Sequence, residues 1–181
     1  RGSEWRKWDL HIHSPQTKMA DDYRVDGDQD VWAAYCRILH ESDVQAFGIT
    51  DYFSIDGYME TTARYKALYS DSKKVFFPNI ELRTNEVVNQ AGEHVNVHLL
   101  FNPSQKDCVE QMRKFLGLLE TNKTQAGGRH LTAIELTAKA HFEEATVTKK
   151  AIEEALKTVY GPQADLTEFV LIVTAANNDG I

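Results

Sequence analysis

The sequence is poor in cysteine, with only Cys36 and Cys108 among its 181 residues. Two thiols do not make a disulfide framework, so we expect two buried free cysteines and a reducing compartment. The chain also lacks an apolar run near the ~18 residues that a membrane helix needs, and its N-terminus lacks the apolar core of a signal peptide. We therefore expect a cytoplasmic protein without a membrane partner.

A basic excess is also lacking, because 20 lysines and arginines stand against 27 acidic residues and give a net charge of −7. The global electrostatic footprint of a nucleic-acid-binding protein is thus missing. A nucleic-acid substrate stays open, since a metal site can neutralise phosphate locally. No internal repeat or low-complexity segment interrupts the chain. We interpret residues 1–3 as a cloning remnant and residues 4–181 as one domain.

Segments with the pattern of strands alternate with segments that have the pattern of helices. Strands are expected over 4–11, 44–50, 74–84 (interrupted by Pro78), 93–101 and 168–176, and helices over 28–42 (capped by Asp28), 57–69, 107–120, 132–141 and 148–160. This alternation predicts an α/β fold with a mainly parallel sheet covered by helices, either barrel-like or open and doubly wound. The last strand is followed by no helix, so we expect this chain to be part of a longer protein.

The stretch WDLHIHS (Trp8–Ser14) places two histidines one residue apart at the end of the first expected strand. Residues i and i+2 of a strand point to one face, so the imidazoles of His11 and His13 converge while Ile12 turns away. A shared metal ion would explain such a pair, because neutral imidazole is among the commonest metal ligands. The alternative is a pair of histidines held by structural hydrogen bonds.

Three further polar residues lie at later strands, in the stretches GITDYFSIDGY, FFPNIELR and HVNVHLLF. They are Asp51, Glu81 and His98. Strand ends are where ligands collect in α/β folds, and imidazoles with carboxylates suit a cluster of divalent metals. Alternatives stay open: a turn or cap role for Asp51, a salt bridge from Glu81 to Arg83, and His94 in place of His98.

The stretches DLHIHS, GITDYFSIDGY, PNIELR and HVNVHLLF together resemble the N-terminal motifs of the PHP (polymerase and histidinol phosphatase) superfamily over residues 5–101. The resemblance implies the N-terminal part of a distorted (β/α)7 barrel, with two or three manganese, zinc or iron ions. It implies hydrolysis of a phosphoester in a nucleotide, a nucleic acid or a small molecule. The implied metal ligands are His11, His13, Asp51, Glu81 and His98, with Asp51 and His98 handling protons.

The sequence departs from the family pattern at Tyr52, where the family has a histidine, and the later motifs have no clear counterpart before Ile181. His130 and His141 are candidates for the missing ligands by residue type only. The opening W-x-K-W-D-L-H-I-H-S-P and the late AANNDG are similar to the PHP domain of TrlF-type proteins. That narrower resemblance implies a C-terminal AAA-like or SMC-like ATPase in the same parent chain and a role in nucleic-acid processing or phage defence.

Three functions therefore follow from the sequence. The first is a metal-dependent phosphoesterase or nuclease. The second is a degenerate PHP domain that serves as a sensor or docking module, because Tyr52 and the missing motifs leave the ligand set incomplete. The third is an amidohydrolase, which also opens a barrel with His-x-His but usually adds a bridging lysine, whereas here Glu81 holds the bridging position.

Overall fold

The computed structural model describes residues 5–19, 23, 30–87 and 94–175, so Asp28 and residues 176–180 of the AANNDG stretch lie outside the described residues. A five-stranded sheet in the order β1-β2-β3-β4-β7 forms the centre of the fold, and a two-stranded hairpin, β5-β6, lies beside it. The strands are β1 (Lys7–His13), β2 (Val44–Tyr52), β3 (Val75–Val87), β4 (His94–Phe101), β5 (Glu120–Thr124), β6 (His130–Thr132) and β7 (Val170–Ala175).

Strand directions divide the sheet into two halves. The strands β1, β2 and β3 run parallel, whereas β4 is antiparallel to both β3 and β7. The prediction of a mainly parallel sheet is therefore wrong for the second half. Only residues 88–93 separate β3 from β4, and a parallel crossover needs a dozen residues or more. The sheet carries helices, which confirms the fold class α/β. It is open, so the described residues form no closed barrel.

The helices are α1 (Val31–Glu41), α2 (Asp56–Leu68), α3 (Cys108–Leu118), α4 (Lys139–Glu144) and α5 (Lys149–Tyr160), with short 3-10 turns at Ala133–Glu135 and Leu166–Glu168. The side chain of Asp30 caps α1 by accepting from the Trp32 amide, so Asp28 is not the cap. The helix expected over 132–141 is wrong, because this stretch holds the end of β6, a 3-10 turn and the start of α4. The strand β5 was not expected at all.

Pro78 does not interrupt β3, contrary to the prediction. It lies opposite Ile49 of β2, and the pairing with β4 begins one residue later, at Asn79. Proline is tolerated where only one side of a strand is paired, because its missing N–H then costs no ladder hydrogen bond.

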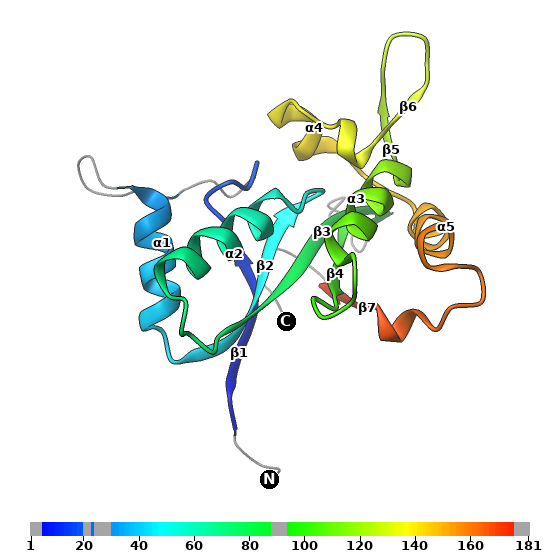
Figure 1. Ribbon diagram of the computed structural model, residues 1–181. Helices are drawn as coiled ribbons and strands as arrows, with labels where there is room; N and C mark the ends of the chain where they lie inside the picture. The colour runs from blue at the N-terminus through cyan, green and yellow to red at the C-terminus, as the bar shows by residue number, and fades with distance from the viewer. Residues whose placement is uncertain (1–4, 20–22, 24–29, 88–93, 176–181) are drawn as a thin grey trace.

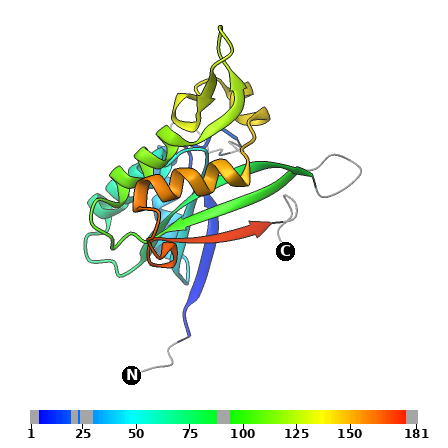
Figure 2. The ribbon, with the colours of Figure 1, turned by 90° about the vertical axis from the view of Figure 1, so that its right-hand side faces the viewer.

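The larger helices lie on one face of the sheet (Figures 1 and 2). One hydrophobic core joins β2 to α1 and α2, and a larger one joins β3 and β4 to α3 and α5. Alternate strand residues such as Ile80, Leu82, Val97 and Leu99 point into these cores. The intervening residues, among them Glu81 and His98, therefore point to the opposite face.

Both cysteines are buried free thiols, Cys36 on α1 and Cys108 at the start of α3, as expected. Among the residues that the structure describes, no helix combines the length and the apolar content required to cross a membrane.

Gly48 allows β1 to pass close to β2. The register shifts between Asp9, opposite Phe47, and Ile12, opposite Ile49, so three steps of β1 match two of β2. A Cβ at Gly48 would lie 2.1 Å from the Leu10 carbonyl oxygen. The irregular segment of β1, which contains His11 and directly precedes His13, therefore packs against Gly48.

We predict that Gly48→Ala lowers the free energy of unfolding by about 1–3 kcal/mol, because the new methyl group overlaps backbone atoms of Leu10. Gly117→Ala, within α3, is the control, since a Cβ there meets no described atom within 4 Å. It should raise the free energy of unfolding by about 0.5–1 kcal/mol. Chemical denaturation measures both values, and equal effects of the two variants would contradict the close approach.

Candidate metal centre

Four of the five predicted site residues meet on the open face of the sheet. His11 and His13 come from β1, Glu81 from β3 and His98 from β4, where His98 lies directly opposite Glu81. The ring of His11 lies 5.0 Å from that of His13 and 4.5 Å from that of His98, centroid to centroid. Ligand atoms of His11, Glu81 and His98 all lie within 4.8 Å of one another.

Glu81 lies at the centre of this group and is only 2% exposed. Its Oε1 accepts a hydrogen bond of 2.7 Å from the Asn96 amide. Its Oε2 is buried and, among the described residues, has no hydrogen-bond partner. A buried carboxylate oxygen without a partner is costly, so this atom calls for a ligand.

The distances around Glu81 fit a shared ion better than direct hydrogen bonds. Nε2 of His11 and of His13 lie 3.4 and 3.7 Å from Oε2, and Nε2 of His98 lies 3.9 Å from Oε1. Hydrogen bonds from nitrogen to oxygen are about 2.7–3.2 Å long. Ligand atoms held tetrahedrally at about 2.1 Å from one ion lie about 3.4 Å apart. The residues present therefore fit a divalent metal.

Neighbouring groups orient two of the imidazoles. Nδ1 of His13 lies 3.1 Å from the Thr50 carbonyl oxygen, which can only accept, so Nδ1 carries the proton and Nε2 keeps its lone pair toward Glu81. The Asn79 amide nitrogen lies 3.3 Å from Nδ1 of His98 and helps to place this ring, whose Nε2 lies 3.9 Å from Oε1 of Glu81. Asn79 is itself fixed by hydrogen bonds of 2.8 Å to the Leu10 carbonyl and to the Thr50 hydroxyl.

The charges in the group suit a cation. Burial acts to raise the pKa of Glu81, but His11 and the other two imidazoles outweigh it, so the pKa is lowered and the carboxylate is charged. Burial lowers the pKa of both His13 and His98, which keeps them neutral at pH 7. The interaction with Glu81 raises the pKa of His11, the most exposed of the three rings.

Asp51 does not join this group, in contrast to the prediction that it is a ligand. It lies in β2 between Thr50 and Tyr52, and its side chain turns to the helix-covered face. There its carboxylate accepts hydrogen bonds of 2.8 Å from both the Ser14 hydroxyl and the Gly57 amide. Burial raises the pKa of Asp51 to about 6. The capping role left open in the sequence is the one the structure shows.

Tyr52 occupies the place beside His13 where the resembling family has a histidine. Its ring is buried and stacks on the His13 ring, with centroids 5.4 Å apart and planes 13° from parallel. Burial and the Glu81 charge raise the pKa of its phenol, which therefore stays protonated. Tyr52 thus packs against one imidazole of the group.

The alternatives named in the sequence lie elsewhere. Arg83 donates to the carbonyl oxygens of Phe142 and Glu143 at the end of α4 and so serves another element than Glu81. His94 pairs with Val87 at the far end of β4. His130 lies in β6 with Nδ1 2.7 Å from the Thr121 carbonyl oxygen, and His141 lies on α4.

Asn96 and Asn79 are functional candidates that the sequence reasoning missed. Both are buried, and both contact a member of the group. The two-residue period of a strand could have found them, because Asn96 precedes His98 and Asn79 precedes Glu81 by two positions.

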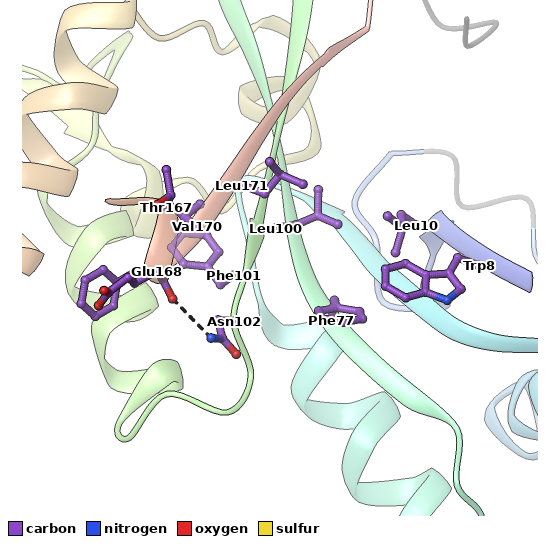
Figure 3. A pocket seen from close by; sticks show the side chains of 11 residues that line it. Trp8, Leu10, Phe77, Leu100, Phe101, Asn102, Thr167, Glu168, Val170 and Leu171 are labelled. Carbon is purple, nitrogen blue, oxygen red and sulfur yellow. Dashed lines mark hydrogen bonds between the residues drawn. The ribbon is translucent and has the colours of Figure 1, made fainter. Parts of the chain in front are cut away.

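An apolar pocket of about 180 Å³ opens on the same face of the sheet, toward the start of β1. Figure 3 shows Trp8 and Leu10 of β1 facing Phe77 of β3, with Leu100 and Leu171 beside them. The rings of Trp8 and Phe77 stack with centroids 6.0 Å apart. Neither Glu81 nor any of the three histidines beside it lines this pocket, so it is a separate feature of the open face.

Comparison with known proteins gives little. No model of a known protein family matches the chain, and no curated protein matches it either. Among solved structures, the chain is similar to a candidate metal-dependent phosphoesterase from Bifidobacterium adolescentis, with 14% identity and a TM-score of 0.34. The match covers 85% of this chain and 50% of that one, so this chain spans about half of that structure. We draw no conclusion from a likeness of this degree.

We predict that Glu81→Gln stabilises the metal-free protein at pH 8.5, by about 1 kcal/mol, because a neutral amide replaces a buried unpaired carboxylate oxygen. Glu86→Gln, at an exposed position of the same strand, is the control and should change stability by less than about 0.5 kcal/mol. Unfolding in urea with a chelator present measures both. Destabilisation by Glu81→Gln beyond that of the control would show that the carboxylate is satisfied without an ion.

Proposed function

We propose that this chain binds a divalent metal through His11, His13, Glu81 and His98 and that the site serves the hydrolysis of a phosphoester. The observation that carries the metal site is the buried Oε2 of Glu81, which has imidazole nitrogens 3.4 and 3.7 Å away and no hydrogen-bond partner among the described residues. Three imidazoles and one carboxylate are a donor set that suits zinc, manganese or iron.

Each residue of the chain has a distinct part in this proposal. Glu81 supplies the negative charge, and Asn96 holds its other oxygen so that Oε2 faces the histidines. Thr50 sets the tautomer of His13. The His11 side chain is 47% exposed, so a substrate approaches the site from its side. A bound divalent ion supplies Lewis acidity toward a phosphoryl oxygen and lowers the pKa of a water molecule.

The choice of a phosphoester rests on the order of the four motifs in the sequence and on Glu81, which is expected to hold the bridging role that a lysine has in an amidohydrolase. A nucleotide or nucleic-acid substrate, a second or third ion, and attachment to an ATPase stay predictions from the sequence resemblance. The net charge of −7 argues against extensive contacts to a nucleic-acid backbone. A substrate bound mainly at its reacting phosphate fits this charge better.

We predict that the chain, purified without chelator or nickel resin, retains about one equivalent or more of zinc, manganese or iron. The double variant His11→Ala/His13→Ala should lose the metal, because two of four ligands are gone. His94→Ala is the control, since His94 lies on β4 away from Glu81 and its loss should leave the metal content unchanged. Elemental analysis measures all three proteins.

Hydrolysis of bis(4-nitrophenyl) phosphate tests the reaction class, in the longest available form of the protein with manganese or zinc added. The double variant should lower the rate about 100-fold or more. Full activity in the double variant would contradict the proposal. Turnover of a cyclic amide without any phosphoester would indicate an amidohydrolase, and metal binding without turnover would indicate a sensor or docking module.

We predict that metal affinity rises with pH through the pKa of His11. The metal-free protein holds a proton on His11 because the pKa of this residue is raised above 6.5, and the metal binds only the neutral ring. His13 and His98 have lowered pKa values and are already neutral, so they add no further proton near neutrality. Calorimetry at pH 6.5 in two buffers of different ionisation enthalpy should detect release of more than about half a proton. Release of none would contradict the raised pKa of His11.

A further inference from the structure

Asp51 is the predicted site residue that does not lie beside Glu81. Its surroundings instead connect it to the segment that follows His13. It is 3% exposed, on the face of the sheet that the helices cover. A carboxylate buried this deeply must have its oxygens hydrogen-bonded. One oxygen accepts from the Ser14 hydroxyl and the other from the Gly57 amide, each at 2.8 Å.

These two hydrogen bonds join the segment after His13 to the first turn of α2. Ser14 is fully buried and follows His13 directly. The residue before α2, Ile55, has an apolar side chain that cannot cap the helix. The Asp51 carboxylate supplies the acceptor at this helix end instead. A Cβ at Gly57 would lie 1.9 Å from the Ser14 hydroxyl oxygen and 2.1 Å from Oδ2 of Asp51. The three segments are therefore in tight contact.

Residues next to this contact bind His13 at its ring and at its backbone. Thr50, the residue before Asp51, accepts from the His13 ring through its carbonyl oxygen. Tyr52, the residue after it, stacks on the same ring. The Tyr23 hydroxyl donates to the His13 carbonyl oxygen. Three consecutive residues of β2 thus fix the ring of His13 and the backbone that follows it.

We propose that Asp51 is a positioning residue of the metal centre, which holds the His13 imidazole in place toward Glu81 through the Ser14 hydroxyl. The inference rests on the proposed function. It assigns to Asp51 a role different from ligation or proton transfer, since the carboxylate touches neither an imidazole nor Glu81. Residues that orient metal ligands typically change affinity 10–100-fold when they are replaced.

The test compares Ser14→Ala, Asp51→Asn and the double variant in metal competition titrations with zinc and with manganese. We expect each single variant to bind about 10–100-fold more weakly with unchanged stoichiometry. The double variant should bind no more weakly than the weaker single variant, because both changes break one contact. Ile152→Val, at a buried position of α5, controls for a loss of stability unrelated to the site and should bind metal like the wild type.

A second readout follows His13 in the metal-free protein. Long-range proton–nitrogen spectra of the imidazoles report which ring nitrogen carries the proton. The wild type should show His13 protonated at Nδ1, and Ser14→Ala should reduce this population while Ile152→Val keeps it. An unchanged His13 signal in Ser14→Ala would overturn the inference whatever the metal data show.

The remaining outcomes separate the inference from the proposed function. If Ser14→Ala binds metal normally while Asp51→Asn loses the affinity that the removal of one metal ligand costs, Asp51 is a ligand. This result would overturn the inference and leave the proposed function intact. Wild-type affinity in both variants would also overturn the inference alone, because neither residue would then affect metal binding. A wild-type chain that binds neither zinc nor manganese would overturn the proposed function and the inference together.

Discussion

The carboxylate of Glu81 lies in the middle of a sheet, 2% exposed, with one oxygen hydrogen-bonded to Asn96 and the other facing imidazoles at distances longer than hydrogen bonds. A buried charge of this kind destabilises a fold unless it is compensated. Structural carboxylates are usually compensated by arginine or lysine, and Arg83 is two residues away on the same strand. Its guanidinium instead donates to carbonyl oxygens at the end of α4. In the metal-free protein the protonated ring of His11 compensates part of this charge, and the proposed metal ion, shared by the histidines, takes the place of that proton.

The mixed direction of the sheet brings the three histidines to this carboxylate. The parallel half aligns the ends of β1, β2 and β3, and the antiparallel strand β4 sets His98 directly opposite Glu81. The register shift in β1 lies between Asp9 and Ile12, where β1 passes close to Gly48, and the pairing resumes with His13 opposite Thr50. The helices pack on the other face of the sheet (Figure 2), and the His11 side chain is 47% exposed.

The two-residue period of strands explains why the sequence predicts the centre of the site and fails at its margin. His11 and His13 are spaced by this period, and Glu81 and His98 alternate with core residues, so their convergence can be expected. Asp51 has the right place along the chain, but its parity puts it on the helix-covered face with Ile49 and Phe47. Neither the place of a residue at a strand end nor the order of motifs carries information on parity, and for this reason both grouped Asp51 with the ligands.

The direction of β4 and the contacts of the two buried asparagines depend on tertiary structure, which the sequence patterns do not report. The length of residues 88–93 excludes a parallel crossover, but this constraint acts on tertiary pairing that hydrophobic patterns do not report. The two-residue period places Asn79 and Asn96 on the same face as Glu81 and His98, but it does not report which group each amide contacts. The polar strand β5, ETNKT, lacks the apolar alternation by which strands are recognised.

The most direct test of the central claim is the X-ray absorption spectrum of the protein loaded with one equivalent of zinc. We predict a first shell of nitrogen and oxygen ligands with the multiple scattering of two or three imidazoles, which disappears in part when His11 or His98 is replaced by alanine. A shell of oxygen ligands without imidazole scattering, or a spectrum unchanged by both replacements, would contradict a metal centre at Glu81.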